Sequence, residues 1–350
     1  MVRRLASGKK RDRGSGERGF HPDPFPRKTK VWMQMFRRLP FFSALPLLTF
    51  FLACGGAGDG GRQFLSIGTA GTGGIYYPIG GAIASRLSAA DSARQYTAEV
   101  TGGSVENVNR LREGQIDLGF ALAVTVYEAF NGGDVYETPF QDLRVVAPLY
   151  ANLVHVLVPR ASSATSVDDL AGARISVGAA GSGTEQVARQ ILEAYGLSYD
   201  EVEARYLTFS ESAASLRDGA IDAAIISVGY PAAAVLEATT TGGANLIPLD
   251  PDRIESLRAI YPYYSSGVIP EGAYPGVNQD IPTVAMMNWV VAKEELDGVV
   301  VRTLLRILRD DRASLAQVHE MAGQIDLAFL AESPVPLHPE AEEWLARREQ

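Results

Sequence analysis

The chain has few of the residues on which disulfides and metal sites depend. It contains one cysteine, Cys54, and four histidines in 350 residues. A single cysteine cannot form an internal disulfide. The histidines, at positions 21, 155, 319 and 338, do not have the spacing of a metal site. We therefore expect no metal, no cofactor and no enzymatic activity.

Positive charge is scarce after the N-terminal segment. Residues 1–53 hold twelve Lys or Arg against three Asp or Glu, and residues 54–350 hold the remaining twenty against thirty-eight. The second segment thus has a net charge of −18, and its only lysine is Lys293. Nucleic acids and anionic lipids both bind basic faces, so this composition argues against either as a partner.

The chain also lacks an apolar run long enough to cross a membrane. The longest, residues 39–53, has two prolines and is shorter than the ~20 residues that a spanning helix needs. It follows two arginines, which is typical of the hydrophobic region of a secretory signal. We interpret residues 1–53 as a signal or leader segment, with the true start at Met33 or Met35, and expect a periplasmic or other extracytoplasmic protein.

Cys54 directly follows this run and precedes two glycines. The arrangement resembles a bacterial lipoprotein signal, in which such a cysteine is lipidated and becomes the mature N-terminus. The alternative is ordinary signal cleavage, with Cys54 a bystander. We favour lipidation, because a lone exported cysteine would otherwise be a reactive thiol. Residues 54–62 are then a lipid anchor and flexible tether, and folded structure begins near Gln63.

An internal repeat indicates the architecture. Residues 64–74 (FLSIGTAGTGG) match residues 174–184 (RISVGAAGSGT) about 110 positions later, and residues 111–119 match residues 216–224 about 105 positions later. Each copy has the order strand, Gly-rich turn, helix, strand, helix, Gly-x-Ile-Asp strand. Convergent β-α-β patterns can mimic one such match. Two matches at similar offsets predict two similar α/β lobes with mainly parallel strands.

The segments between and after the copies predict where the chain crosses from lobe to lobe. Residues 143–158 look like two strands with a break at positions 151–152, and residues 283–292 look like a returning strand. We expect lobe 1 to comprise residues 63–150 and 283–350, and lobe 2 residues 151–282. Two crossings make a hinge that can close around a ligand.

These residues together resemble a known family. Residues 67–80 (IGTAGTGGIYYPIG) are similar to the signature of the TAXI family, the extracytoplasmic solute receptors of one class of TRAP transporters. The likeness continues through residues 101–107, 176–185, 211–222, 261–264, 269–276 and 337–339. The resemblance implies a type II periplasmic-binding-protein fold with a two-strand hinge. It also implies a membrane permease with fused subunits as partner, sodium-coupled uptake, and dicarboxylate or amino-acid ligands.

Helix N-termini carry partial positive charge and unpaired N–H groups, so they bind anions without Lys or Arg. Both Gly-rich turns lead into helices, and glycines let the backbone approach a ligand. Hydroxyl and phenol groups nearby can donate to a carboxylate. We expect a monomer that binds a small carboxylate with Thr69, Gly73, Gly74, Tyr76, Tyr77, Ser104, Asn107, Ser182, Gly183 and Thr184.

Each of these residues also has a purely structural interpretation. Residues 182–185 read as a capping box, which alone accounts for Ser182. Ser104 and Asn107 fit the cap and first turn of a helix. Tyr76 and Tyr77 cannot both face one core, because neighbours on a helix point about 100° apart.

One departure from the family bears on the ligand. Relatives carry a polar stretch with Gln and Asp where this chain has Leu122 and Val124. Without a carboxylate there, the site lacks the obvious partner for a ligand ammonium group, which is costly to bury alone. We predict a preference for a 2-oxo acid or dicarboxylate over glutamate. Glu106, Glu128 or Glu211 are other sources of the charge, and a register shift of one residue would instead turn both apolar side chains into the core.

Two other functions compete with this interpretation. A nucleotide-binding enzyme would have a related Gly-rich turn, but the glycines at 68, 71, 73 and 74 do not fit G-x-G-x-x-G and no P-loop lysine follows. A receptor of an ABC transporter or of a sensor protein would use the same fold.

Overall fold

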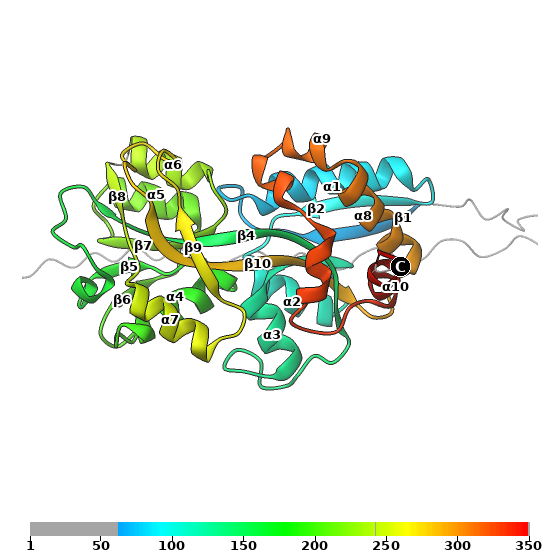
Figure 1. The fold of residues 1–350 in the computed structure, drawn as a ribbon, viewed down its shortest axis with the longest axis horizontal. Coiled ribbons are helices and arrows are strands. Elements are labelled where there is room, and N and C mark those ends of the chain that lie inside the picture. Colours follow the sequence, from blue (N-terminus) through cyan, green and yellow to red (C-terminus); the bar gives the residue numbers. More distant parts are fainter. Residues whose placement is uncertain (1–61, 242, 349–350) are drawn as a thin grey trace, which may run out of the picture. The chain divides into compact units, whose positions relative to one another are not determined.

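The computed structural model describes residues 62–241 and 243–348. Cys54 and the expected signal segment lie outside the described residues. The described chain forms an α/β fold around a ten-stranded mixed sheet of order β2-β1-β3-β10-β4-β7-β5-β6 (Figure 1). Strand β8 pairs with β4, and β9 pairs with β10.

The predicted repeat is present as two β-α-β-α-β units. The first unit comprises β1 (Gln63–Gly68), α1 (Tyr76–Ala90), β2 (Arg94–Glu99), α2 (Ser104–Arg112) and β3 (Leu118–Leu122). We call this unit, together with the helices that pack on it, lobe 1. The second, in lobe 2, comprises β5 (Arg174–Ser176), α4 (Gly183–Ala194), β6 (Glu203–Arg205), α5 (Phe209–Arg217) and β7 (Ala223–Val228). In each unit the first strand lies between the other two and parallel to both.

The shared Gly-x-Ile-Asp motif has the same structural role in both units: its glycine follows the end of a helix, and its aspartate binds the first strand of the unit. Gly114 and Gly219 have φ of +69° and +67°, the left-handed conformation with which helices commonly end. The aspartate three residues later then accepts a hydrogen bond from the backbone of the unit's first strand. Asp117 accepts from Ser66 N at 2.8 Å, and Asp222 accepts from Arg174 N at 2.9 Å.

Two long antiparallel strands connect the lobes. Strand β4 (Leu143–Pro159) pairs with β7 and β8 (Ala244–Ile247), and β10 (Ile281–Lys293) pairs with β3 and β9 (Ser265–Ile269). The break predicted at positions 151–152 was wrong, because β4 is continuous there. Its residues at these positions pair directly with Met286 and Met287 of β10, and the ladder shifts register next to Met287 instead.

Helices cover both faces of the sheet (Figure 1). In lobe 1, α1 and α8 (Gly298–Asp310) lie on one face, and α2 and α3 (Ala123–Asn131) on the other. In lobe 2, α5 and α6 (Ala233–Thr240) oppose α4 and α7 (Pro251–Ile260). The remaining elements are α9 (Arg312–Ala316), α10 (Pro339–Arg348) and three 3₁₀ turns, η1 (Val167–Leu170), η2 (Glu320–Gln324) and η3 (Leu327–Glu332). Within the described residues, no helix has the length and hydropathy of a membrane span.

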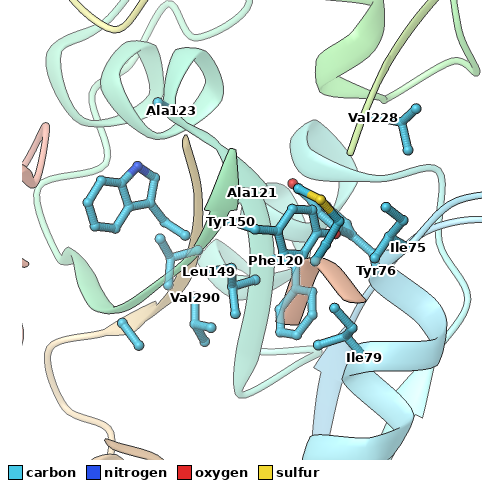
Figure 2. Packing of buried hydrophobic residues seen from close by; sticks show 14 of the residues in the cluster. Ile75, Tyr76, Ile79, Phe120, Ala121, Ala123, Leu149, Tyr150, Val228 and Val290 are labelled. Atoms are coloured by element: carbon cyan, nitrogen blue, oxygen red, sulfur yellow. The ribbon is translucent and has the colours of Figure 1, made fainter. Parts of the chain in front are cut away.

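Buried side chains form two apolar clusters, whose largest fully buried members include Trp289, Tyr150 and Phe120. Tyr76 packs edge-on against Phe120, with ring centroids 5.4 Å apart. Figure 2 shows Tyr76 and Tyr150 entering the same region of this packing from α1 and β4. The core is therefore aromatic where β4 passes α1 and β3.

Candidate functional site

A cavity of about 300 Å³ lies where four strand-to-helix turns meet the crossing strands. It is lined by the turns that follow β1, β2, β5 and β6, by Leu122 at the end of β3, and by residues of β4 and β7. In an open α/β sheet, ligands bind outside the carboxyl ends of the strands, so this is where a ligand is expected.

Four helices begin at the cavity wall: α1, α2, α4 and α5. The first N–H groups of a helix have no carbonyl partner in that helix, and together they carry partial positive charge. Helices α1 and α2 have no side-chain cap, so nothing of that kind competes for their N–H groups. At α5, the Thr208–Glu211 capping box puts a carboxylate on the helix end, which offsets its positive charge.

No residue that lines the cavity, within the part of the chain that the structure describes, has a charged side chain. The polar groups there are hydroxyls, one carboxamide and backbone. An anion entering this cavity would meet helix N-termini and hydroxyl donors. A cation would meet no counter-charge.

Glycines at the cavity rim let the two lobes touch. A methyl group added at Gly73 would lie 2.4 Å from Ser210 Oγ, and one at Gly102 would lie 2.6 Å from the carbonyl oxygen of Ala180. Both contacts join lobe 1 to lobe 2. From the sequence, we expected Gly73 to let a ligand approach the backbone. In the structure, the group that approaches Gly73 is Ser210 of the other lobe.

A direct hydrogen bond also joins the lobes at this rim. The backbone N–H of Glu106, in the first turn of α2, donates to the carbonyl of Gly181 at 3.0 Å. Next to it, a methyl group at Gly183 would lie 2.8 Å from Ser104 Oγ and 2.9 Å from Leu122 Cδ1. The lobes are therefore in contact around the cavity.

The structure brings seven of the ten predicted site residues to the cavity: Gly73, Gly74, Tyr76, Ser104, Ser182, Gly183 and Thr184. The other three, Thr69, Tyr77 and Asn107, do not line it. Thr69 is fully buried and its hydroxyl donates to the carbonyl of Glu99 at 2.6 Å. Asn107 is also fully buried, and its amide donates to the carbonyls of Thr69 and Phe120. Tyr77 is exposed while its neighbour Tyr76 is buried.

Two predicted caps differ from the observed ones. Ser182 is the N-cap of α4 and accepts from Glu185 N at 3.2 Å, but Glu185 does not complete a capping box. Its carboxylate instead binds Arg189 at 2.7 Å and the Tyr199 hydroxyl at 2.9 Å. Ser104 is the first helical residue of α2, not its cap, and its hydroxyl accepts from Leu122 N at 3.1 Å.

Sequence reasoning missed the residues that we call the floor of the cavity: Tyr150 and Asn152 of β4 and Ser227 of β7. Asn288 of β10 holds Tyr150 and Asn152 in place through hydrogen bonds. Its amide donates to the carbonyl of Tyr150 at 2.7 Å and to Asn152 Oδ1 at 2.8 Å, and its oxygen accepts from the Tyr76 hydroxyl. Asn152 in turn donates to the carbonyl of Ser227 at 2.9 Å. The polar Asn152 inside an apolar strand was the available signal, and it was interpreted as a break.

Two floor hydroxyls have no hydrogen-bond partner among the residues that the structure describes. Tyr150 and Ser227 are 1% and 3% exposed, and neither side-chain oxygen contacts a donor or acceptor. Burial raises the pKa of Tyr150 well above its usual value, so the phenol keeps its proton and can donate. Buried polar groups without partners are uncommon, which makes these two notable.

From the sequence, Leu122 and Val124 could either line the cleft or both face the core, and the structure gives a different answer for each residue. Both residues are buried in the same apolar cluster, but Leu122 also lines the cavity and Val124 does not. The three glutamates named as other sources of the missing charge do not line the cavity. Glu106 accepts from Gly102 N at 2.7 Å, Glu128 from Gln186 at 2.7 Å, and Glu211 caps α5.

The described residues contain no cluster of three or more His, Cys, Asp or Glu able to hold a metal ion. His155 is fully buried in β4, away from the cavity, between the carbonyl of Leu153 at 3.0 Å and the Tyr274 hydroxyl at 3.1 Å. Burial lowers the pKa of His155 to about 4, so the ring is neutral and has a structural role.

Solved structures to which this chain is similar include proteins from several bacteria. PhnD1 from Prochlorococcus marinus, in complex with methylphosphonate, is 13% identical, with 82% of this chain and 98% of that chain covered and a TM-score of 0.52. The aliphatic sulphonate binding protein SsuA from Escherichia coli is 16% identical, covering 81% and 83%, with a TM-score of 0.44. A putative L-cystine ABC transporter protein from Listeria monocytogenes is 15% identical, covering 75% and 98%, with a TM-score of 0.47.

The likeness to PhnD1 shows the fold alone, an α/β fold around a mixed sheet, which is the fold class that the sequence predicted. A family model described as "NMT1-like family" matches residues 67–346, which is most of the chain. The chain therefore belongs to the NMT1-like family.

Proposed function

We propose that the protein is an extracytoplasmic solute receptor that captures a small carboxylate between its lobes and delivers it to a membrane permease. The observation that carries the proposal is the cavity wall: four helices begin there and none of its described residues is charged. Helix N-termini alone can bind an anion in such a site. The bounds proposed for the lobes are those expected from the sequence, residues 63–150 with 283–350, and residues 151–282.

The same wall favours a solute without an amino group. An ammonium group buried beside Leu122, with no carboxylate among the described residues that line the cavity, loses its hydration without compensation. We therefore propose that 2-oxo acids or dicarboxylates bind better than glutamate. The resemblance to TAXI receptors supports a TRAP permease with fused subunits as the partner, and a monomeric receptor.

A ligand screen tests this proposal. Calorimetry and thermal unfolding of the full chain would be measured with 2-oxo acids, succinate, glutamate, methylphosphonate, sugars and nucleotides. We expect carboxylates without an amino group to raise the melting temperature, because a ligand at a hundred times its Kd stabilises the folded state by about 2.7 kcal/mol. A response to sugars or nucleotides only would contradict the proposal, and tighter binding of methylphosphonate would reassign the receptor to another oxyanion.

Two substitutions at α4 identify the turn that holds the carboxylate. Thr184→Val should weaken carboxylate binding by about 10- to 150-fold, as expected for a lost hydrogen bond to a charged group. Ser182→Ala removes an observed cap and should also lower the free energy of unfolding by about 1 kcal/mol without ligand. Unchanged affinity in both variants would remove this turn from the site.

The lipid anchor is a separate proposal. Cys54 follows an apolar run and is the only cysteine of the chain, so we propose that it is lipidated and holds the receptor at the membrane. Expression with labelled palmitate in a Gram-negative host should label the wild-type chain and not Cys54→Ser. Equal labelling and equal membrane fractionation of the two would contradict the anchor.

A further inference from the structure

The floor of the cavity contains an unassigned pair of hydrogen-bonding groups. Tyr150 and Ser227 come from neighbouring strands, β4 and β7, which pair through Val154 and Ser227. Both residues are more than nine-tenths buried and both line the cavity, and neither hydroxyl has a hydrogen-bond partner within residues 62–241 and 243–348. A buried polar group without a partner costs about 1–3 kcal/mol.

The fold holds these two residues firmly through their backbones. The carbonyl of Tyr150 accepts from Asn288 and the carbonyl of Ser227 accepts from Asn152, while Asn288 also binds Asn152. The side chains of Asn152 and Asn288 and the two backbone carbonyls therefore have hydrogen-bond partners, whereas the hydroxyls of Tyr150 and Ser227 have none among the described residues. Ordered positions with free hydroxyls are what a site needs to bind a fixed polar group.

The charge of that group follows from its surroundings. The helix N-termini lie on the walls, at the carboxyl ends of β1, β2, β5 and β6, whereas the floor belongs to the strands themselves. A second carboxylate at the floor would be buried against neutral groups, and an ammonium would meet the same lack of counter-charge. A neutral oxygen can accept from both hydroxyls without this cost.

We propose that Tyr150 and Ser227 bind an uncharged oxo or hydroxyl oxygen of the solute, so that the receptor selects oxo or hydroxy monocarboxylates. This rests on the proposed function, since the helix N-termini take the carboxylate. Of the two ligand classes in the proposed function, it favours oxo acids over dicarboxylates, and it ranks plain fatty acids and amino acids below the oxo and hydroxy acids. The apolar lining from Ile75, Leu122 and Phe209 accommodates the carbon chain.

The test uses matched five-carbon probes with the full chain and with Tyr150→Phe. Calorimetry would compare pentanoate, 2-oxopentanoate, 4-oxopentanoate, 2-hydroxypentanoate, 2-aminopentanoate and pentanedioate. We expect at least one oxo or hydroxy acid to bind about tenfold tighter than pentanoate, and Tyr150→Phe to reduce this ratio of affinities by about 3- to 10-fold. Ser227→Ala should act in the same direction.

Stability without ligand separates a binding role from a structural one. The Tyr150 hydroxyl makes no hydrogen bond, so Tyr150→Phe should unfold at the wild-type temperature or above. Tyr136→Phe is the matched control: Tyr136 is 2% exposed but does not line the cavity, and the ratio of affinities should stay as in the wild type.

The two levels of the proposal fail in different ways. If pentanoate or pentanedioate binds as tightly as every oxo and hydroxy acid, and Tyr150→Phe changes no ratio, the floor assignment is wrong while the carboxylate receptor stands. If no carboxylate binds at all, the proposed function itself is wrong.

Discussion

Replacing Asn288 by leucine should lower the free energy of unfolding by about 3–5 kcal/mol. Asn288 is fully buried in β10 and ties that strand to β4 and α1 through Tyr76, Tyr150 and Asn152. Leucine has a similar volume, so the packing change is small. The substitution leaves a phenol, a backbone carbonyl and a carboxamide oxygen buried without their partner, each at a cost of about 1–3 kcal/mol.

Urea denaturation of the two proteins measures this effect directly. Asn109→Leu is the matched control, because Asn109 is exposed on α2 and its replacement should change stability by less than about 0.5 kcal/mol. A loss below about 1 kcal/mol for Asn288→Leu would mean that the network does not hold the crossing strands together. The same variant should weaken solute binding, since the floor depends on these hydrogen bonds.

Acidification should destabilise the protein by about 3 kcal/mol through His155 alone. The ring lies inside lobe 2, where the Tyr274 hydroxyl faces one nitrogen and the carbonyl of Leu153 faces the other. Burial lowers the pKa of His155 from 6.5 to about 4, so the folded state favours the neutral ring. The stabilisation is complete above pH 6.5 and is lost as the pH falls towards 4, because the unfolded chain then binds the proton more readily.

Two measurements separate His155 from the carboxylates. The NMR titration of its ring should give a midpoint near pH 4 in the folded protein. Asp222 has a pKa lowered to about 2 by its hydrogen bonds and charge pairing with Arg174, so its contribution is lost at lower pH. In His155→Gln the fall in stability between pH 6.5 and 4.5 should be smaller than in the wild type. A midpoint near 6.5 would contradict the burial argument.

The sequence by itself determined the architecture. Local signals specify it: the Gly-x-Ile-Asp motifs around Gly114 and Gly219 end a helix and begin a strand in the same way wherever they occur. Their repetition at a nearly constant offset predicted two similar lobes, and the long apolar runs predicted both crossing strands. The Gly-rich turns also predicted most of the cavity wall, because a helix N-terminus is recognisable from its cap and glycines.

Only the tertiary structure decided which polar groups face the cavity. Thr69 and Asn107 have the residue types of a ligand site, yet the Thr69 hydroxyl donates to the carbonyl of Glu99 in β2, and the Asn107 amide donates to the carbonyls of Thr69 and Phe120. Tyr150 and Ser227 look like members of apolar strands, yet both residues line the cavity and their buried hydroxyls have no hydrogen-bond partner among the described residues. The floor joins strands that are more than seventy residues apart in the chain. Successive side chains of a strand point to opposite faces of the sheet, and the local sequence does not show which face will meet residues of the other lobe.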